Sequence, residues 1–477
     1  MSADKTGSID LTTQVSNWEI GGWIATLVLS PVCYVVAHHL GMTMQGSLFT
    51  AIMATVILMW LFNLVDDYIP PLMGMFAGLF FGLAPASVAL AGMASPSLLT
   101  LMGVFALASV IAESGLSRRV VLSLLLKLPN RFFWQENILV FCGLLLSLVS
   151  PSGNSRISLL LPLFKEMSQS LHLPKRGVAI TSLMAATYGG AMLFSTALAN
   201  SKSASVAAMS MLPTYLQNQY LGIFWLMAAA LPIIFLVVIH LASIKVMFRG
   251  ETPSKIDKDT VRAQLKALGK PGYNEKCGAI AFLFFFIGSL TTGIHFVNIA
   301  NIAGMTILLL LLAGVFTKAG FQKSIDWPMI FFMLSMDSMM RTLSYLGLDQ
   351  QLSNFMGSFY TFVDGSFVLY TLATLATTVV MRLAFPVAAG MLLSFIILLP
   401  ITITQGYSPW ICLFLTAMFS DIWFFRYQSS VYLTAWNSNA VLDFEHKWFM
   451  RHNNVMNLAR VLCVFAAIPI WQWMELI

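Results

Sequence analysis

An apolar run that is broken by a polar tip constrains the fold of this chain more than any other feature. Residues 149–164 read VSPSGNSRISLLLPLF, so Arg156 stands inside sequence that is mostly apolar. In a bilayer every backbone polar group needs a partner within the protein, so such a break persists only where it is buried or lines a cavity. Broken membrane segments of this kind hold the cargo of many secondary transporters. We therefore expect a re-entrant segment at a binding site.

The composition indicates a chain that lies mostly within a membrane. Hydrophobic residues make up 58% of the sequence, charged residues make up 10%, and the mean hydropathy is +0.81. Apolar segments occur at 20–40, 46–64, 70–90, 97–113, 137–150, 177–199 and 219–247, and then at 277–293, 299–317, 327–347, 366–385, 387–404, 409–425 and 455–475. A spanning helix needs about 20 apolar residues, so we predict an all-α polytopic membrane protein with about 11 transmembrane helices. The other segments are expected to be re-entrant or short.

The positive charges predict which side of the membrane the loops face. The stretch 245–276 holds eight Lys and Arg residues against four acids, and loops of this kind stay in the cytoplasm. We therefore divide the chain into a polar tail (1–18), a first transmembrane repeat (19–247), a cytoplasmic linker (248–275) and a second transmembrane repeat (276–477). The tail shows no signal-peptide pattern. The net charge of +6 is attributed to membrane topology, and no nucleic-acid partner is expected.

A short amphipathic stretch follows Gly115. Residues 117–130 read SRRVVLSLLLKLPN, which is too short and too charged to span a membrane. Its cations place it on the cytoplasmic side. A helix that lies in the membrane interface and an exposed linker helix both fit this pattern.

The two halves of the chain share an order of motifs that indicates an internal repeat. Gly115 follows an apolar segment in the first half, and Gly347 does so in the second. Each is followed by an apolar segment, a proline-containing apolar stretch and another long apolar segment, so that Pro162 matches Pro400. If an odd number of spans precedes the linker, the repeats are inverted and the substrate lies between them near the midplane.

This arrangement resembles the divalent anion/sodium symporters, the dicarboxylate and citrate carriers of the ion transporter superfamily. In that family each repeat has a re-entrant hairpin whose Ser-Asn-Thr tip lies ten residues before a proline. Here Ser152, Gly153 and Asn154 occupy that place before Pro162. The resemblance extends by order and spacing from about residue 45 to the end. It implies two inverted repeats with re-entrant hairpins, and a homodimer.

The segment after the first hairpin continues the resemblance. The family has a Gly-Gly pair followed ten residues later by an Asn, and Gly190 and Asn200 keep this spacing without the family's prolines. The matching place in the second repeat lies around Gln428. The second hairpin tip departs from the family, because the residues before Pro400, GMLLSFIILL, contain no Ser-Asn-Thr.

Arg156 is the sharpest departure, because the family has a small neutral residue there. An arginine at the membrane centre costs at least ~2.5 to 3.5 kcal/mol, so a function is expected. We hypothesise that Arg156 supplies a fixed positive charge where sodium-coupled relatives supply a bound ion, and anchors a carboxylate, phosphate or sulfonate. Transport would then be anion exchange or uniport with little sodium dependence. In the alternative, Arg156 snorkels to a hairpin mouth or pairs with an acid such as Asp421.

Hydroxyl and amide side chains at hairpin tips and unwound turns can donate hydrogen bonds to an oxyanion. A capped helix start would also explain the tip residues. The predicted substrate-binding residues are Ser152, Asn154, Ser155, Arg156, Ser195, Thr196, Asn200, Arg426, Gln428 and Ser429. The resemblance further implies sodium ligands at Ser152, Asn154 and Gly190, and no other cofactor is expected.

Two intramembrane acids, Asp421 and Asp337, are candidates for carrying a coupling proton. Asp337 lies four residues before Arg341, on one helical face, and this spacing favours a structural ion pair. The cysteines and histidines show no metal-ligand spacing, and the sequence contains no metalloprotease, P-loop, nucleophile-elbow or dinucleotide motif.

We therefore predict a secondary active transporter of small organic anions, of the di- or tricarboxylate type. It is expected to work by elevator-type alternating access in the lipid of the inner membrane. One alternative is a proton- or cation-linked exchanger of the same superfamily. Another is a membrane enzyme that acts on a lipid-linked substrate, which is disfavoured because Asp66-Asp67 is the only adjacent acid pair.

Overall fold

The computed structural model describes residues 17–477 apart from 128–131, 149, 172, 221, 250–257, 292–294, 296, 349–350, 352–362, 364 and 438–443. These residues form helices and no strand. The first half contains α1 (Asn17–His39), α2 (Met44–Leu61), α3 (Ile69–Phe80), α4 (Ala86–Ala89), η1 (Ala91–Ala94), α5 (Ser97–Glu113), α6 (Leu116–Lys127), α7 (Phe132–Ser147), α8 (Gly153–Ser170), α9 (Val178–Met192), η2 (Ala199–Ser201), α10 (Ser203–Ser210), α11 (Thr214–Tyr220) and α12 (Ile223–Met247).

The second half follows the polar linker. It contains α13 (Lys258–Ala267), α14 (Tyr273–Leu290), α16 (Ile299–Leu312), α17 (Lys318–Lys323), α18 (Trp327–Tyr345), α20 (Phe367–Ala384), α21 (Val387–Thr404), α22 (Pro409–Phe419), η4 (Arg426–Gln428), α23 (Ser430–Asn437) and α24 (His446–Trp473). Among the described residues five helices are long and apolar enough to cross a membrane, namely Glu19–His39, Met44–Leu61, Ile223–Met247, Val387–Thr404 and His446–Trp473. The all-α polytopic prediction is confirmed, and the total number of spans stays a prediction.

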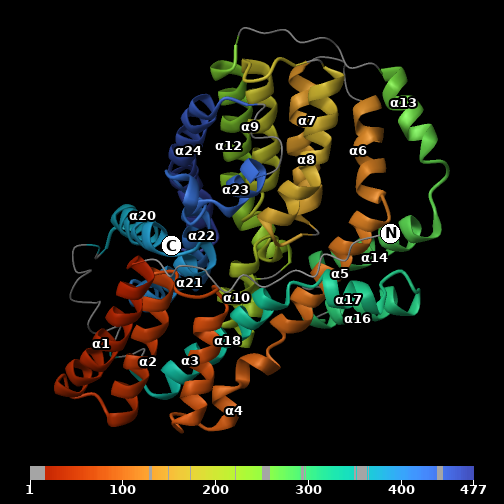
Figure 1. Cartoon of the computed structure of the whole chain (residues 1–477). Helices are drawn as coiled ribbons and strands as arrows, with labels where there is room; N and C mark the ends of the chain where they lie inside the picture. The colour runs from red at the N-terminus through yellow and green to blue at the C-terminus, as the bar shows by residue number, and fades with distance from the viewer. Residues whose placement is uncertain are drawn as a thin grey trace, which may run out of the picture.

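Two helical hairpins dominate the architecture, α7 with α8 and α20 with α21 (Figure 1). At the first tip Pro151 and Ser152 interrupt the helix, and the Ser152 hydroxyl accepts a hydrogen bond from the Ser155 amide at 3.4 Å as an N-cap. At the second tip α20 ends before Phe385, and Pro386 caps the start of α21. A proline suits this place because it has no amide hydrogen to leave unpaired.

The second tip does not lie where the sequence spacing placed it. The residues that precede Pro400 by ten or fewer belong to the interior of α21, and the break is at Phe385 and Pro386. Pro386 is fourteen residues before Pro400, so the tip comes four residues, about one helical turn, earlier than in the first hairpin. The expected position of the tip was wrong because it was counted back from Pro400, which lies inside α21.

A broken segment follows each hairpin. In the first half α9 leads through η2 to α10, and in the second half α22 leads through η4 to α23. A long helix then closes each half, and these two helices, α12 and α24, pack side by side (Figure 1). The shared order of elements supports the predicted internal repeat, and the inverted orientation stays a prediction.

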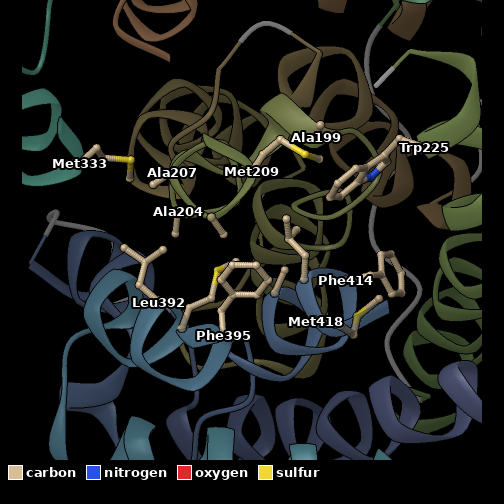
Figure 2. Close-up of a cluster of buried hydrophobic side chains, with 14 of the residues drawn as sticks. Ala199, Ala204, Ala207, Met209, Trp225, Met333, Leu392, Phe395, Phe414 and Met418 are labelled. Carbon is tan, nitrogen blue, oxygen red and sulfur yellow. The ribbon is translucent and has the colours of Figure 1, made fainter. Parts of the chain in front are cut away.

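One part of the hydrophobic core lies where the first broken segment meets the second hairpin. Ala204 and Ala207 of α10 face Leu392 and Phe395 of α21, with α22 beside them (Figure 2). Small side chains on α10 allow its backbone to approach these helices closely. The core therefore joins the two halves directly beneath the hairpin tips.

The described part of the polar linker docks onto the fold. Arg119 of α6 binds Glu275 through two hydrogen bonds of 2.7 and 3.1 Å, and Lys258 of α13 donates to the Leu126 carbonyl at 3.1 Å. Leu122 of α6 is buried between these elements and the first hairpin. Helix α6 is therefore packed into the protein, which excludes the exposed linker helix. Residues 250–257 of the predicted linker lie outside the described residues.

Candidate functional site

A cavity of about 770 Å³ lies between the two hairpin tips and the two breaks. The connection between α2 and α3, Phe105 of α5 and the start of α18 close its other side. Its polar wall consists of Ser152, Asn154, Arg156, Ser195, Lys202, Ser203, Arg382, Ser420, Asp421, Gln428, Ser429 and Ser430. Every group in this wall comes from a tip, a break or the helical turn beside one, because these are the places where the backbone leaves the helix.

Arg156 ties the first tip to the first break. Its Nη1 donates to the carbonyls of Ser150 at 3.3 Å and Ser201 at 3.0 Å, and the side chain is only 1% exposed. The Ser203 amide closes the same junction on the Pro151 carbonyl at 3.1 Å. Among the described residues no carboxylate pairs with Arg156 and its Nε has no hydrogen-bond partner. The guanidinium thus keeps donor capacity beside the cavity.

Arg382 ties the second tip to the second break in the same way. Its Nε donates to the Ser420 carbonyl and its Nη1 to the Phe385 carbonyl, both at 2.9 Å, while its Nη2 donates to the Gln428 carbonyl. The Gln428 side chain in turn donates a hydrogen bond to the Arg382 carbonyl at 3.1 Å and accepts one from the Phe424 amide at 2.8 Å. These bonds satisfy backbone groups that the breaks release, as a membrane interior requires.

Lys202 and Asp421 join the two breaks to each other. The Lys202 ammonium lies 2.6 Å from Asp421 Oδ1, 2.7 Å from the Ser420 hydroxyl and 2.9 Å from the Ala417 carbonyl. The Ser195 hydroxyl donates to the other Asp421 oxygen. Every hydrogen of the ammonium therefore has an acceptor, and the ion pair crosslinks the halves at the cavity wall.

The buried charge of the wall is positive. Arg156, Lys202 and Arg382 are all less than a tenth exposed, and Asp421 is the one buried carboxylate among the described lining residues. The two other lining acids, Asp67 and Asp326, are exposed. Three buried cations against one buried carboxylate favour an anionic ligand, because an uncompensated charge is costly in a medium of low dielectric.

The structure brings seven of the predicted site residues to this cavity. They are Ser152, Asn154, Arg156, Ser195, Asp421, Gln428 and Ser429. The Ser429 hydroxyl lies 3.0 Å from the Tyr188 hydroxyl and accepts the Tyr432 amide at 3.1 Å, so it holds the start of α23 in place. Arg156 does not pair directly with Asp421, which the alternative for this arginine had suggested.

Four predicted substrate-binding residues lie elsewhere, namely Asn200, Arg426, Thr196 and Ser155. Asn200 lines a separate space of about 20 Å³ against α14 and α16. Arg426 lies over the Trp436 ring at 4.3 Å and donates to His446 at 3.2 Å. Thr196 is buried, and its carbonyl accepts the Trp225 indole. Matching positions in the repeat therefore predicted the breaks but not which side chain faces the cavity.

The other predictions outside the cavity involve Ser155, Gly190 and Asp337. Ser155 lies in the first turn of α8, where its amide is the donor to the Ser152 cap. A Cβ at Gly190 would strike the Leu139 carbonyl of α7, so this glycine serves helix packing. Asp337 pairs with Arg341 at 3.0 Å, as the four-residue spacing predicted. Gly190 is thus away from Ser152 and Asn154, the other two predicted sodium ligands.

Lys202 and Arg382 are the charged residues of the polar wall that were not predicted as site residues, and Ser203, Ser420 and Ser430 are the hydroxyl residues that were not. Both are cations within apolar sequence, and this is the signal that marks an intramembrane functional residue. Lys202 follows Asn200 by two residues, and Arg382 precedes the second tip by four. Both were recognisable as intramembrane charges, but the sequence did not show that they line the cavity.

Comparison with solved structures supports the fold. The chain is similar to the crystal structure of the YdaH transporter of Alcanivorax borkumensis, described as having an unusual topology, with a TM-score of 0.50. The match covers 84% of this chain and 89% of that chain at 15% sequence identity. At this identity the likeness shows the fold alone.

Comparison of sequences places the chain in a family. It is 24% identical over 244 residues to the inner membrane protein YbhI of Escherichia coli (strain K12), and it spans about half the length of that relative. A multi-pass location in the inner membrane is thereby confirmed. The model of the citrate transporter family, CitMHS, matches residues 57–419.

This family match refines the resemblance found in the sequence. It supports membership of the ion transporter superfamily, and it does not support the divalent anion/sodium symporter family in particular. A transporter family also sets aside the membrane enzyme acting on a lipid-linked substrate. The chain belongs to the citrate transporter family.

Proposed function

We propose that this protein is a secondary active transporter of small organic anions of the di- or tricarboxylate type, citrate among them. The observation that carries the proposal is the excess of buried cations in the cavity wall, three against one carboxylate. An anion with at least two carboxylates would neutralise this excess. The name of the family, citrate transporter, agrees with such a substrate.

Arg156 is the proposed anchor of the anion. Two backbone carbonyls hold one nitrogen of the guanidinium in a fixed place, and the rest of the group keeps unused donors at the cavity. A carboxylate can accept two hydrogen bonds from one guanidinium, which sets orientation as well as affinity. Ser152 and Asn154 at the tip, with Ser195 and Ser429 at the breaks, are placed to bind further oxygens.

Alternating access is proposed to follow the elevator type. Arg156, Arg382 and the Lys202–Asp421 pair connect the tips to the breaks, so we expect these parts to move together as one rigid unit. The opposite wall comes from the end of α2, the connection between α2 and α3, Phe105 of α5 and the start of α18, and it contributes mostly apolar groups. A polar body that slides along an apolar wall would carry the anion across. Homodimerisation and specific lipid contacts stay predictions.

The first candidate for coupling is an exchange of anions without sodium. In this account the fixed cations replace a bound metal ion. Movement of the empty, positively charged site back across the membrane would be unfavourable. An outgoing anion would relieve that penalty.

The second candidate is a proton- or cation-linked exchanger. The observation that supports it is Asp421. This buried carboxylate lies at the cavity wall and forms an ion pair with Lys202, which also lines the cavity. An intramembrane acid in such a position is a plausible proton carrier. Asp337 is less suited, because it pairs with Arg341 away from the cavity.

The test is uptake of labelled citrate and succinate into proteoliposomes. Each anion is measured with a sodium gradient, with a proton gradient, and with unlabelled anion loaded inside. The proposal predicts uptake driven by internal anion, and loss of uptake in Arg156→Met with retention in Arg262→Met, an exposed arginine of α13. Uptake that requires a proton gradient and is lost in Asp421→Asn would favour the second candidate. Absence of uptake for any carboxylate would overturn the proposed function.

A further inference from the structure

A second polar cluster lies behind the cavity wall, between α9, α12 and α24. We define it as His240, His452, Asn457 and Arg460, none of which lines the cavity. Each side chain is between 1% and 5% exposed. The two imidazole rings meet edge to face, with centroids 5.0 Å apart. The His240 ring lies against Gly189, where a Cβ would collide with it, so the first glycine of the Gly-Gly pair makes room for this ring.

Six polar atoms of this cluster have no hydrogen-bond partner among the described residues. They are Nδ1 and Nε2 of His240, Nε2 of His452, Oδ1 of Asn457, and Nε and Nη1 of Arg460. Buried polar groups in native proteins almost always have partners, which are often bound waters or ions. The two imidazoles are in ring contact and Arg460 is their electrostatic neighbour, so their unpartnered atoms indicate a shared ligand rather than separate packing defects.

The charge of the cluster indicates what that ligand is. Arg460 forms no ion pair with any described residue, although it is an electrostatic neighbour of both imidazoles, of Tyr188 and of Asp421. Asp421 already binds Lys202 and Ser195. Most of the unpartnered atoms are hydrogen-bond donors, or imidazole nitrogens that can donate. A buried cation surrounded by donors requires an anion, and water alone leaves the charge uncompensated.

We propose that this cluster binds a small monovalent anion of chloride size, held by Arg460 and the two imidazoles, as a fixed counter-ion distinct from the transported substrate. Asn457 Oδ1 would accept a hydrogen bond from a water beside the anion. The site is coupled to the cavity through α24, because Asn453 and Asn457 donate to the Trp423 carbonyl at 2.9 and 2.8 Å. Trp423 belongs to the break that carries Gln428 and Ser429. A bound anion would therefore stabilise the second break.

The experiment measures the thermal unfolding temperature of the purified full chain in detergent. Chloride replaces gluconate, an anion too large for the cluster, at constant ionic strength. The expected result is a saturable rise in Tm with chloride, and also with bromide. Arg460→Met is expected to raise the half-saturating chloride concentration about tenfold or more, because a hydrogen bond to a charged group is lost. Arg262→Met, on an exposed helix, is the matched control and should respond to chloride like the wild type.

Two further variants keep the outcome decisive. If Arg460→Met does not fold, His452→Asn removes one donor and should raise the half-saturating concentration severalfold. Arg156→Met should retain the chloride response, since Arg156 belongs to the cavity. A wild-type protein without any halide response would overturn the proposal in favour of bound water. A response lost in Arg156→Met and kept in Arg460→Met would also overturn it, because the halide would then occupy the substrate cavity. Neither measurement depends on the proposed transport activity.

Discussion

At the scale of single residues, the charged side chains of the cavity are of two kinds: those held in structural contacts, such as Lys202 and Asp421, and those with donors left to bind a ligand. The pair is 2.6 Å apart and almost fully buried, and hydroxyls from both halves complete its hydrogen bonds. Arg382 is likewise engaged by three carbonyls. Arg156 differs, because one of its nitrogens holds the first tip while its Nε has no hydrogen-bond partner in the described part of the chain. This difference is the reason for assigning the ligand to Arg156.

Replacement of Lys202 tests whether the Lys202–Asp421 pair stabilises the protein. Lys202→Met leaves Asp421 buried without its cation, and breaking a buried pair in this way costs about 3 to 5 kcal/mol. We expect a large fall in thermal stability in detergent. The double variant Lys202→Met with Asp421→Asn should recover part of the loss, because the uncompensated charge is removed. A single variant as stable as the wild type would show that the pair does not hold the two breaks together.

The hairpin tips and breaks are the units that matter at the scale of elements. Gly153 begins α8 in contact with α23, and a Cβ there would lie 2.8 Å from Val431 and 3.1 Å from Met192. The first tip of one half thus packs on the helix that follows the break of the other half. This contact, like the Lys202–Asp421 pair, joins the two halves of the chain.

Gly153→Ala is expected to destabilise the protein by about 1 to 3 kcal/mol, because the new methyl group overpacks this junction. Val431→Ala in the same chain should restore part of the stability by making space. The measurement is the thermal unfolding of the three variants in detergent. Equal losses in the single and double variants would contradict the proposed contact between the tip and α23.

Helix α7 meets α9 through glycines, and this contact gives a second prediction for the elements. A Cβ at Gly143 would strike the backbone of Gly190, which cannot yield as a side chain can. Gly143→Ala should therefore lower the unfolding temperature strongly. Gly78→Ala in α3 is the matched control, since its added Cβ would meet nothing within 4 Å. Similar unfolding temperatures for the two variants would show that α7 and α9 are not closely packed there.

The elements also show which parts of the fold the sequence could predict. Apolar length and polar interruption predicted the helices, the first tip and both breaks, because these depend on the local demand for backbone hydrogen bonds. The second tip was misplaced by about one turn, since Pro400 lies inside α21 and does not measure the distance to the break. The position of Arg426 over Trp436 depends on tertiary contacts, which no spacing in the sequence encodes.

The cluster of Lys202, Arg382 and Asp421 was only partly predictable for the same reason. Each residue is conspicuous as a charge within apolar sequence, but the sequence does not say which charges meet. Lys202 and Asp421 are 219 residues apart and come together only when the halves pack. Asp337 and Arg341 were predicted correctly as a pair because both belong to one helix turn.

The whole molecule combines these parts into a body that carries charge and a wall that is largely apolar. Arg119 of α6 pairs with Glu275 at the start of α14, so the first half is tied to the start of the second. The family match over residues 57–419 covers both hairpin tips and the first break completely. We therefore expect the anion site, rather than either half alone, to be the functional unit of the protein.

The most direct test of this account is the affinity of citrate for the purified protein, measured by calorimetry in the wild type, Arg156→Lys, Arg156→Met and the control Arg262→Met. Arg156→Lys keeps the charge but loses the paired donors, so binding should weaken by about tenfold or more. Arg156→Met should bind citrate weakest, while its unfolding temperature shows that the tip remains folded, and Arg262→Met should bind like the wild type. A folded Arg156→Met protein that binds citrate as tightly as the wild type would contradict the assignment of Arg156 as the anion anchor.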